Sequence, residues 1–422
     1  MLTNGINGFR GKRVLLLQGP VGPFFHRLGQ DMEQAGAKVF KVNFNGGDWL
    51  FYRKNAFSYR DSISGWPEYF EKLITQLNIE VVILFGDCRP IHTAAHEISQ
   101  RHGLEIGVFE LGYVRPHYVT FERSGVNAHS LIPRSPVFYL NSRIPKVQEP
   151  QSLGNTFWPS VVWTVLYYLF AITLKPLFWQ YEHHRPLELT EGLLWVRTIW
   201  RKWFYGLKEY GKEQKLVSEH SGRFFLVPLQ VHNDSQIHTH SDFDSVKEFI
   251  TGVMSSFSRH APRNTMLVLK HHPRDRAYND YHRFIAKRIK EYGLKGRCLY
   301  IHDQHLPTLL KHTRGVVVVN STVGLSALLH NAPVNVCGNA LYDMKGLTFQ
   351  GGLNQFWRRA KHSQPNRKLL DRFVSYLVQN TQLNGSFYKR TASIGTATGL
   401  RWPETSGRNG VSAANKKIRN ES

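Results

Sequence analysis

The sequence predicts an α/β protein made of two Rossmann-like halves, and three observations lead to this fold class. Short aliphatic runs typical of buried parallel strands recur along the chain, such as Val81–Phe85 and Val316–Val319. Segments with helical periodicity follow most of these runs, as expected of right-handed βαβ units. The alternation stops near residue 133 and begins again near residue 221, so two such halves are expected.

The first half occupies residues 1–150. Its predicted strands lie at 12–18, 37–44, 81–85 and 105–110, and its predicted helices lie at 24–35 and 91–101. Strands alternating with helices imply a parallel sheet with helices packed on it. Residues 133–150 are rich in Pro, Ser and Asn, and they are predicted to form a loop.

The second half occupies residues 221–388. Its predicted strands lie at 224–228, 267–270, 298–301, 316–319 and 333–337, and its helices lie at 244–256, 280–292, 324–329 and 369–383. Residues 389–422 contain few large apolar side chains, so a disordered tail is expected there. Two paired lobes facing a cleft are the layout of glycosyltransferase B enzymes, in which the C-terminal lobe holds the nucleotide.

An apolar and basic helical insert, residues 151–220, separates the two halves. Within it, the uncharged stretch Ser160–Leu174 is shorter than the about 20 residues that cross a bilayer. Three alternatives stay open for residues 157–179: a helix buried in the protein core, a helix lying in a membrane interface, and a membrane span. Trp158 and Trp163, with the basic surroundings, favour a membrane interface.

The composition limits the partners and the compartment. The chain has 54 basic and 31 acidic residues, a formal net charge of +23, which calls for an anionic partner such as nucleic acid, acidic lipid or a charged substrate. The basic residues form no nucleic-acid-binding signature, so nucleic acid is not expected. Three scattered cysteines form neither a disulfide framework nor a zinc motif, and residues 1–10 lack the apolar core of a signal peptide. We therefore expect a cytoplasmic protein.

Two strand ends in the second half predict a site for a phosphate-bearing ligand. Polar side chains at a helix N-terminus bind anions well, and ligands of α/β sheets bind at the carboxyl ends of the strands. The residues assigned to this nucleotide site are Lys270, His271, His272, Pro273, Asn320, Ser321, Thr322 and Gly324. The alternatives are that the histidines only close the strand end and that Asn320–Thr322 only cap the helix.

Metal-independent chemistry is expected at this site. Adjacent histidines on a strand point to opposite faces, so His271 and His272 cannot readily bind one ion. The sequence contains one Asp-x-Asp triplet, Asp242 to Asp244, at the start of a predicted helix. Acidic residues there are expected to cap the helix and complement its dipole rather than hold a metal.

Two carboxylates are candidates for catalysis. Asp234 is the only carboxylate of the polar loop after strand 224–228, whose other candidate residues, assigned to substrate binding, are Gln230, Ser235 and Gln236. Glu110 ends a strand of the first half and is expected to face the cleft, with Arg115 nearby as a further substrate-binding residue. The alternatives are an ordinary polar loop and a Glu110–Arg115 ion pair. One carboxylate from each lobe fits the nucleophile and acid roles of glycosyl transfer.

Four motifs together resemble the bacterial capsule polysaccharide biosynthesis and export family of KpsS and LipB type. They are Val227–Gln236, Leu269–Pro273, Asn320–Gly324 and Gly338–Tyr342, and the resemblance covers roughly residues 12–360. It implies a retaining β-Kdo transferase that needs no cofactor. The enzyme would take Kdo from CMP-Kdo and start a poly-Kdo linker on a lysophosphatidylglycerol acceptor at the inner membrane, where it would be peripheral and would meet other capsule assembly proteins.

The resemblance also implies roles for single residues. His272 and Pro273 match the His-Pro nucleotide motif, Ser321 and Thr322 match the CMP-phosphate site, and the N-terminal lobe becomes the acceptor lobe. Glu110 matches the acid and Asp234 the catalytic aspartate, although related transferases carry an Asp-Gln pair where this chain has Leu229 and Gln230. A non-catalytic adaptor in a capsule assembly complex is the alternative function.

Overall fold

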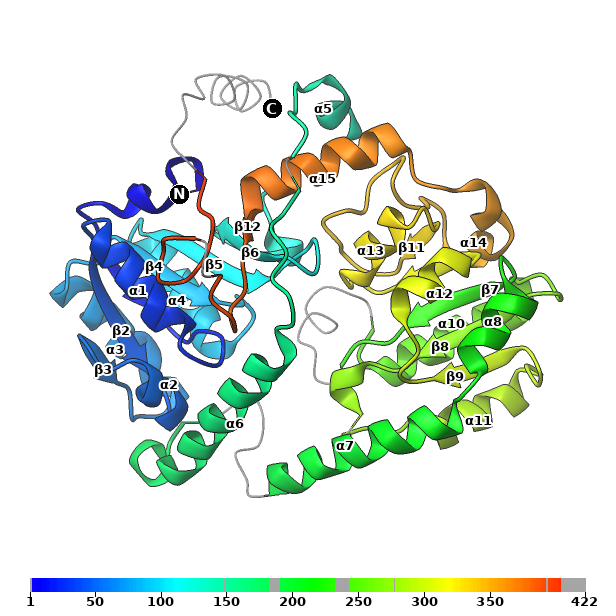
Figure 1. Cartoon of the computed structure of the whole chain (residues 1–422), viewed down its shortest axis with the longest axis horizontal. Helices are drawn as coiled ribbons and strands as arrows, with labels where there is room; N and C mark the ends of the chain where they lie inside the picture. The colour runs from blue at the N-terminus through cyan, green and yellow to red at the C-terminus, as the bar shows by residue number, and fades with distance from the viewer. Residues whose placement is uncertain are drawn as a thin grey trace.

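The computed structural model describes residues 2–147, 149–181, 190–231, 243–276, 278–391 and 394–403. Two β-sheets lie side by side in it, each with helices packed against it (Figure 1). The first has seven strands in the order β12-β6-β5-β4-β1-β2-β3, and the second has five in the order β11-β10-β7-β8-β9. The two-lobed α/β fold class predicted from the sequence is confirmed.

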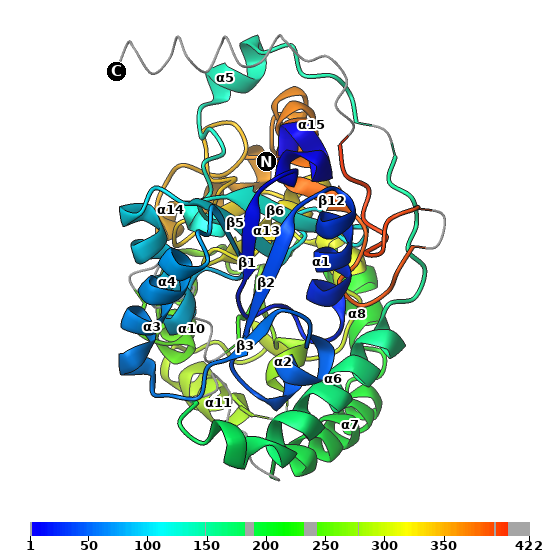
Figure 2. The same ribbon diagram turned by 90° about the vertical axis from the view of Figure 1, so that its left-hand side faces the viewer.

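The N-terminal sheet is parallel from β3 to β5 and ends in two antiparallel strands. Its elements are β1 (Arg13–Leu16), α1 (Phe24–Gln34), β2 (Lys38–Asn43), α2 (Gly46–Phe51), β3 (Ala56–Ser58), α3 (Trp66–Gln76), β4 (Val81–Phe85), α4 (Pro90–Arg101), β5 (Glu105–Leu111) and β6 (Tyr118–Arg123). Helix α1 covers one face of the sheet, and α3 and α4 cover the other (Figure 2). The central strands are buried on both faces, which explains their unbroken aliphatic runs.

The C-terminal sheet is parallel throughout. Its elements are β7 (Phe224–Pro228), α10 (Val246–His260), β8 (Met266–Lys270), α11 (His282–Glu291), β9 (Cys298–Ile301), α12 (Leu306–His312), β10 (Gly315–Val318), α13 (Val323–Leu329), β11 (Val334–Val336) and α14 (Leu353–Arg359). The predicted strands of this half agree with the observed ones to within one or two residues. Strands β3 and β6 of the N-terminal sheet were not predicted.

After the last strand of the C-terminal sheet, the chain crosses back to the N-terminal sheet. Helix α15 (Arg367–Thr381) leads into β12 (Gln382–Asn384), which pairs with β6 (Figure 1). Ending the C-terminal lobe at residue 388 was therefore wrong, because β12 completes the other sheet.

The predicted disordered tail also begins too early. Residues 394–403 pack on the N-terminal lobe, where Leu400 and Trp402 are buried in its apolar core. The buried carboxylate of Asp31 accepts hydrogen bonds from the amide of Thr398 at 3.0 Å and from its hydroxyl at 2.5 Å. Burial of two large apolar side chains and hydrogen bonds to one buried carboxylate thus attach this segment to the lobe. Residues 404–422 lie outside the described residues.

The insert contributes α6 (Phe157–Thr173), the 3-10 turn η4 (Lys175–Phe178), α7 (Thr190–Lys208) and α8 (Lys212–His220). Ahead of it, the short helix α5 (Pro136–Asn141) lies within residues 133–150, which were predicted to be a loop. Helix α6 packs on α2, where a Cβ atom at Gly46 would lie 2.1 Å from the carbonyl oxygen of Phe170. Tyr167, Tyr168 and Ala171 bury one face of α6. The buried-helix alternative therefore holds for one face only. Among the described residues, no helix is both long enough and apolar enough to cross a membrane.

Candidate functional site

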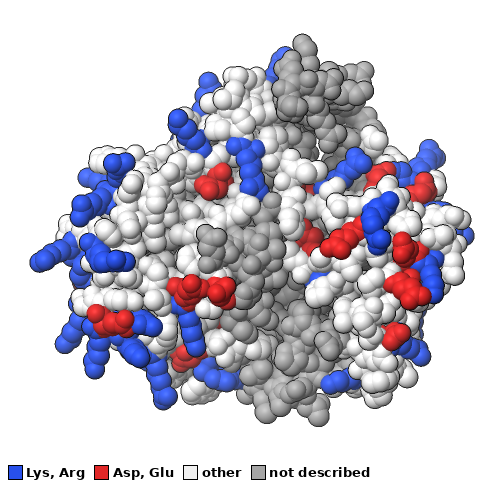
Figure 3. All heavy atoms as spheres, turned by 180° about the vertical axis from the view of Figure 1, so that it is seen from behind, with Lys and Arg blue, Asp and Glu red and all other residues white. Residues whose placement is uncertain are grey.

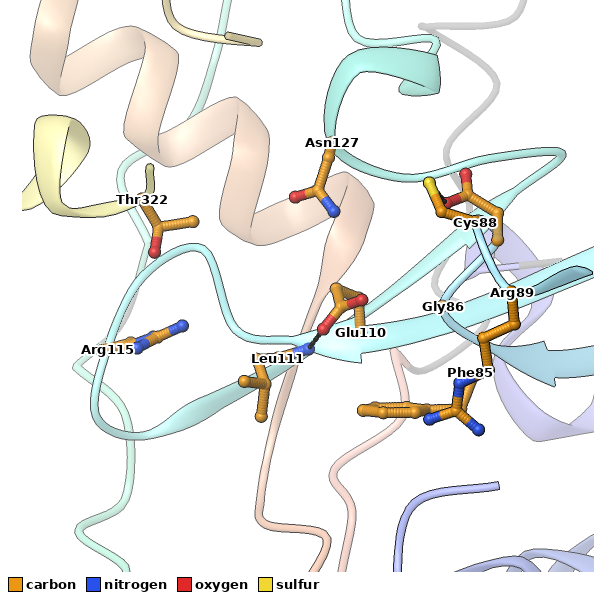
Figure 4. A pocket seen from close by; sticks show the side chains of 10 residues that line it. Phe85, Gly86, Cys88, Arg89, Glu110, Leu111, Arg115, Asn127 and Thr322 are labelled. Atoms are coloured by element: carbon orange, nitrogen blue, oxygen red, sulfur yellow. Dashed lines mark hydrogen bonds between the residues drawn. The ribbon is translucent and has the colours of Figure 1, made fainter. Parts of the chain in front are cut away.

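A pocket of about 240 Å³ lies between the two lobes. Its lining residues are Phe85, Gly86, Asp87, Cys88, Arg89, Glu110, Leu111, Arg115, Asn127 and Thr322. Most come from the carboxyl ends of β4 and β5 and the loops that follow them, and Thr322 comes from the start of α13 in the other lobe (Figure 4). The structure thus brings three predicted site residues, Glu110, Arg115 and Thr322, to one pocket.

Glu110 supplies the acidic group of this pocket. Its carboxylate accepts a hydrogen bond from the backbone amide of Leu111 at 2.7 Å (Figure 4). Burial raises the pKa of Glu110 above its ordinary value; the Leu111 hydrogen bond and the positive charges of Arg89 and Arg115 offset part of this rise, and Asp87 adds to it. A carboxyl group with a raised pKa can hold or accept a proton nearer to neutral pH, as general acid–base chemistry requires.

Arg89 is a cation of the pocket that sequence reasoning missed. Its guanidinium donates to Gln18 Oε1 at 2.7 Å and lies 5.5 Å from the ring centroid of Phe85. The signal was present, because Arg89 lies in the short polar segment after β4, and polar residues after a parallel strand often serve the ligand site. With Arg115, it gives the pocket two guanidinium groups, which suit carboxylate and phosphate groups.

Asp87 holds the loop on the opposite side of the pocket. Its Oδ2 atom accepts from the amide of Val126 at 3.1 Å and contacts His129 Nδ1 at 3.0 Å. Asp87, Cys88 and His129 each place a possible metal ligand atom within 4.8 Å of the others. These three residues form the set, among the described residues, that could hold a metal ion; the expectation of metal-independent chemistry stays a prediction.

A buried carboxyl behind the pocket, Glu122, orients the same loop and was also missed. Tyr113 donates its hydroxyl to Glu122 Oε1 at 2.6 Å, and Ser130 donates to Glu122 Oε2. The Tyr113 hydroxyl in turn accepts the amide of Asn127, a pocket residue. Burial raises the pKa of Glu122 to about 7. A glutamate inside the buried run of β6 was the available signal, but β6 itself was not predicted.

Lys270, His271, His272 and Pro273, at the end of β8, differ in burial. Lys270 is buried and donates to the carbonyl of His302 at 2.8 Å. His271 is also buried, its Nδ1 atom lies 2.7 Å from the Tyr300 hydroxyl, and burial lowers its pKa to about 3. Both side chains therefore make their contacts inside the lobe, and the burial of His271 agrees with the alternative in which the histidines only close the strand end. His272 is half-buried and Pro273 is exposed, so these two are open to a ligand.

The residues after β10 are hydrogen-bonded to two other motifs of the family resemblance, Val227–Gln236 and Gly338–Tyr342. Gln230 donates to Asn320 Oδ1 at 3.0 Å, and Tyr342 donates its hydroxyl to the carbonyl of Ser321. A Cβ atom at Gly324 would lie 2.1 Å from the Tyr342 hydroxyl, so Gly324 is needed for close packing rather than for ligand contact. Ser321 accepts the amide of Val323 through its hydroxyl at 3.2 Å. The side chains of Asn320, Ser321 and Thr322 are half-buried.

The polar loop after β7 lies largely outside the described residues. Asp234, Ser235 and Gln236 lie outside the described residues, as does Asp242. Asp244 is described, and its backbone amide donates to Glu248 at 2.8 Å. The cap of α10 is Ser245, whose hydroxyl accepts the amide of Glu248, so the capping residue is the one that follows Asp244.

Comparison with known proteins shows which family this chain resembles in sequence. Residues 80–388 match the model of the family described as capsule polysaccharide biosynthesis protein. The capsule polysaccharide export protein KpsS of Escherichia coli is 41% identical over 90% of this chain and 97% of that protein. The capsule polysaccharide modification protein LipB of Neisseria meningitidis serogroup B is 40% identical over 90% of this chain and 92% of that protein.

A solved structure that matches most of the chain is the Thermosulfurimonas dismutans β-Kdo 2,7 transferase KpsC. It is 14% identical, covers 89% of this chain and 93% of that chain, and gives a TM-score of 0.43. The extent and identity of the sequence matches decide the classification: this chain belongs to the capsule polysaccharide biosynthesis protein family.

Proposed function

We propose that this protein is a retaining β-Kdo transferase that transfers Kdo from CMP-Kdo to a lysophosphatidylglycerol acceptor and so starts a lipid-linked poly-Kdo linker. One observation carries the proposal. A carboxyl group with a raised pKa, Glu110, shares an inter-lobe pocket with Arg89 and Arg115, opposite Thr322 of the other lobe. The family motifs and the relatives named as capsule export and modification proteins support it.

The charges of the pocket suit the proposed donor. CMP-Kdo carries a phosphate and a sugar carboxylate, and guanidinium groups bind both with charge-assisted hydrogen bonds. We assign Arg89 and Arg115 to these anionic groups of the donor. Ser321 and Thr322, at the start of α13, are assigned to the phosphate, and His272 with Pro273 to the nucleotide.

The proposed chemistry is a double displacement, which retains the anomeric configuration. Asp234 attacks the anomeric carbon of Kdo, the bond to the CMP phosphate breaks, and CMP leaves with the bonding electron pair. The acceptor hydroxyl then displaces Asp234 from the sugar while Glu110 takes the hydroxyl proton. The role of Asp234 is supported by the family resemblance, and that of Glu110 also by its place in the pocket. The proposed reaction needs no cofactor and no metal ion.

The acceptor defines the proposed location. Lysophosphatidylglycerol is a membrane lipid, so we place the protein on the cytoplasmic face of the inner membrane as a peripheral protein. Other capsule assembly proteins are its proposed neighbours there, and nucleic acid is not a proposed partner.

The test is a reaction of purified protein with CMP-Kdo and a lysophosphatidylglycerol analogue, followed by mass spectrometry of the lipid. The expected product is the acceptor enlarged by one or more Kdo units, with a Kdo adduct on Asp234 as the trapped intermediate. An adduct on another residue would refute the nucleophile alone. Absence of product from folded protein that still binds other capsule assembly proteins would favour the adaptor alternative.

A further inference from the structure

Most of the large exposed hydrophobic side chains among the described residues gather in one part of the chain, from α6 to the residues after α7. They are Phe157, Trp158, Val162, Val165, Leu169, Leu177, Trp179, Trp200, Trp203, Phe204, Leu207 and Tyr210. Exposed apolar side chains scattered singly need no explanation, but a gathered set marks an interaction surface. We call this set, with the helices that carry it, the α6–α7 surface.

Helix α6 presents its share of this surface as a regular stripe. Trp158, Val162, Val165 and Leu169 recur every three or four residues, which places them on one face of the helix. The opposite face, with Tyr167, packs on the N-terminal lobe. The outward stripe is thus not needed to attach α6 to the protein.

Helix α7 attaches to the C-terminal lobe through polar and aromatic side chains and not through its large apolar ones. Arg201 donates to the carbonyl of Arg276 at 2.6 Å, and Glu209, just beyond the helix, accepts from the amide of His302 at 2.9 Å. Tyr205, on the same face, stacks on His302 with ring centroids 3.6 Å apart. The apolar face points away from the lobe, and its exposed side chains are Trp200, Trp203, Phe204, Leu207 and, just beyond the helix, Tyr210.

The two helices form a continuous surface. Lys202 Nζ on α7 lies 5.9 Å from the ring centroid of Phe157 at the start of α6. Both views of the ribbon place α6 and α7 along the same end of the molecule (Figures 1 and 2). Because α6 is packed on the N-terminal lobe and α7 on the C-terminal lobe, the surface runs across both lobes.

The charged side chains of this region determine which partner fits. Lys175, Arg197, Lys202 and Lys208 are exposed around the apolar set, whereas Glu209 is buried against His302. A second copy of the chain is a poor partner, because each copy has a net charge of +23 and basic side chains lie over both lobes (Figure 3). A bilayer with anionic headgroups complements both features, since tryptophan and tyrosine favour the membrane interface and lysine and arginine favour anionic lipid.

We propose that the α6–α7 surface binds the face of an anionic lipid bilayer and that both helices, one from each lobe, lie in the interface. The proposal rests on the proposed function in one respect, that the bilayer is the inner membrane. It deepens that function by naming the part of the molecule that brings a lipid acceptor near the pocket.

A short hydrogen-bonded chain connects this surface to the pocket. Gln18 donates to the hydroxyls of Tyr181 at 2.9 Å and of Tyr167 at 3.4 Å, and Arg89 donates to Gln18 at 2.7 Å. Tyr167 belongs to α6, Tyr181 follows η4, and Arg89 lines the pocket. One buried glutamine therefore ties the proposed membrane helix to a cationic wall of the site.

Vesicle flotation tests the proposal without any donor sugar. The protein is expected to float with phosphatidylcholine vesicles that contain phosphatidylglycerol, and to float less with phosphatidylcholine alone or at high salt. Trp158→Ser and Trp203→Ser are each expected to weaken partitioning on the order of tenfold. Lys202→Glu combined with Lys208→Glu is expected to remove the preference for phosphatidylglycerol. Its matched control is Lys290→Glu combined with Lys295→Glu, two exposed lysines at and after the end of α11.

Val137→Ser and Ile63→Ser repeat the apolar-to-serine change at exposed positions outside the surface, and they should bind vesicles like the natural chain. Failure of the natural chain to float with phosphatidylglycerol vesicles would overturn the proposal, as would equal losses in surface and control variants. A dimer in sedimentation velocity that Trp203→Ser dissociates, without vesicle binding, would identify a second copy as the occupant and also overturn it.

Transfer to a soluble acceptor analogue separates this inference from the proposed function. If the serine variants keep that transfer and lose vesicle binding, the surface is confirmed and the enzymatic function stands. If the natural chain binds vesicles through this surface but shows no transfer, the surface is confirmed and the enzymatic proposal fails.

Discussion

The hydroxyl of Tyr113 donates a hydrogen bond to Glu122 Oε1 at 2.6 Å, and this pair sits directly behind the loop that carries Asn127 into the pocket. Burial raises the pKa of Glu122 from an ordinary value of 4.5 to about 7. Between these values the folded protein retains a proton that the unfolded chain has lost. The stabilising contribution of Glu122 is therefore complete below the unfolded value and is lost as the pH rises through about 7.

Replacing Glu122 by glutamine should abolish this pH dependence. The natural chain is expected to lose on the order of 3 kcal/mol of unfolding free energy across that window relative to Glu122→Gln, which has no proton to release. Denaturant unfolding of both proteins below and above the window measures the difference. A constant difference across the window would show that Glu122 titrates with an ordinary pKa.

Glu110→Gln should lower the proposed transfer roughly 10²–10⁴-fold, because the amide cannot accept the proton of the acceptor hydroxyl. The amide oxygen can still accept the hydrogen bond from the Leu111 amide, so thermal stability and CMP binding should change little. The rate and CMP affinity are measured on the same preparations. A rate equal to that of the natural chain would assign proton transfer to another group.

His271 and His272 are adjacent in sequence but should respond differently to alanine. His272→Ala is expected to weaken CMP binding on the order of tenfold with little change in stability, because the half-buried side chain is open to a ligand. His271→Ala should cost about 1–3 kcal/mol of stability, because the buried Tyr300 hydroxyl loses a hydrogen-bond partner. Calorimetry with CMP and thermal unfolding of each variant separate the two effects; the reverse pattern would contradict both assignments.

Leu400→Ala tests the segment that the sequence assigned to a disordered tail. Leu400 is fully buried in the N-terminal core, so its loss should cost about 2–5 kcal/mol of unfolding free energy. Arg401→Ala, at the exposed neighbouring position, serves as the control and should be nearly neutral. Equal stability of the two variants would mean that residues 394–403 do not pack as described.

The sequence by itself determined the two-lobed α/β class and the strand ends where the site is built. Runs such as Val316–Val319 are readable because a parallel strand buried on both faces must be apolar throughout. Glu110 and Thr322 were found because polar residues that follow such runs lie at one edge of a sheet. These patterns can be read from the sequence because the burial of a strand determines which residues that strand itself contains.

Tertiary structure decided which of those side chains face the pocket and which distant segments meet. Lys270 faces inward, where it donates to the carbonyl of His302, and Arg89 is linked to α6 through Gln18. The return of β12 and the outward apolar face of α7 also depend on how the two lobes pack. Such contacts join residues far apart in the chain, so no local periodicity records them, and they follow only once the helices and sheets are assembled.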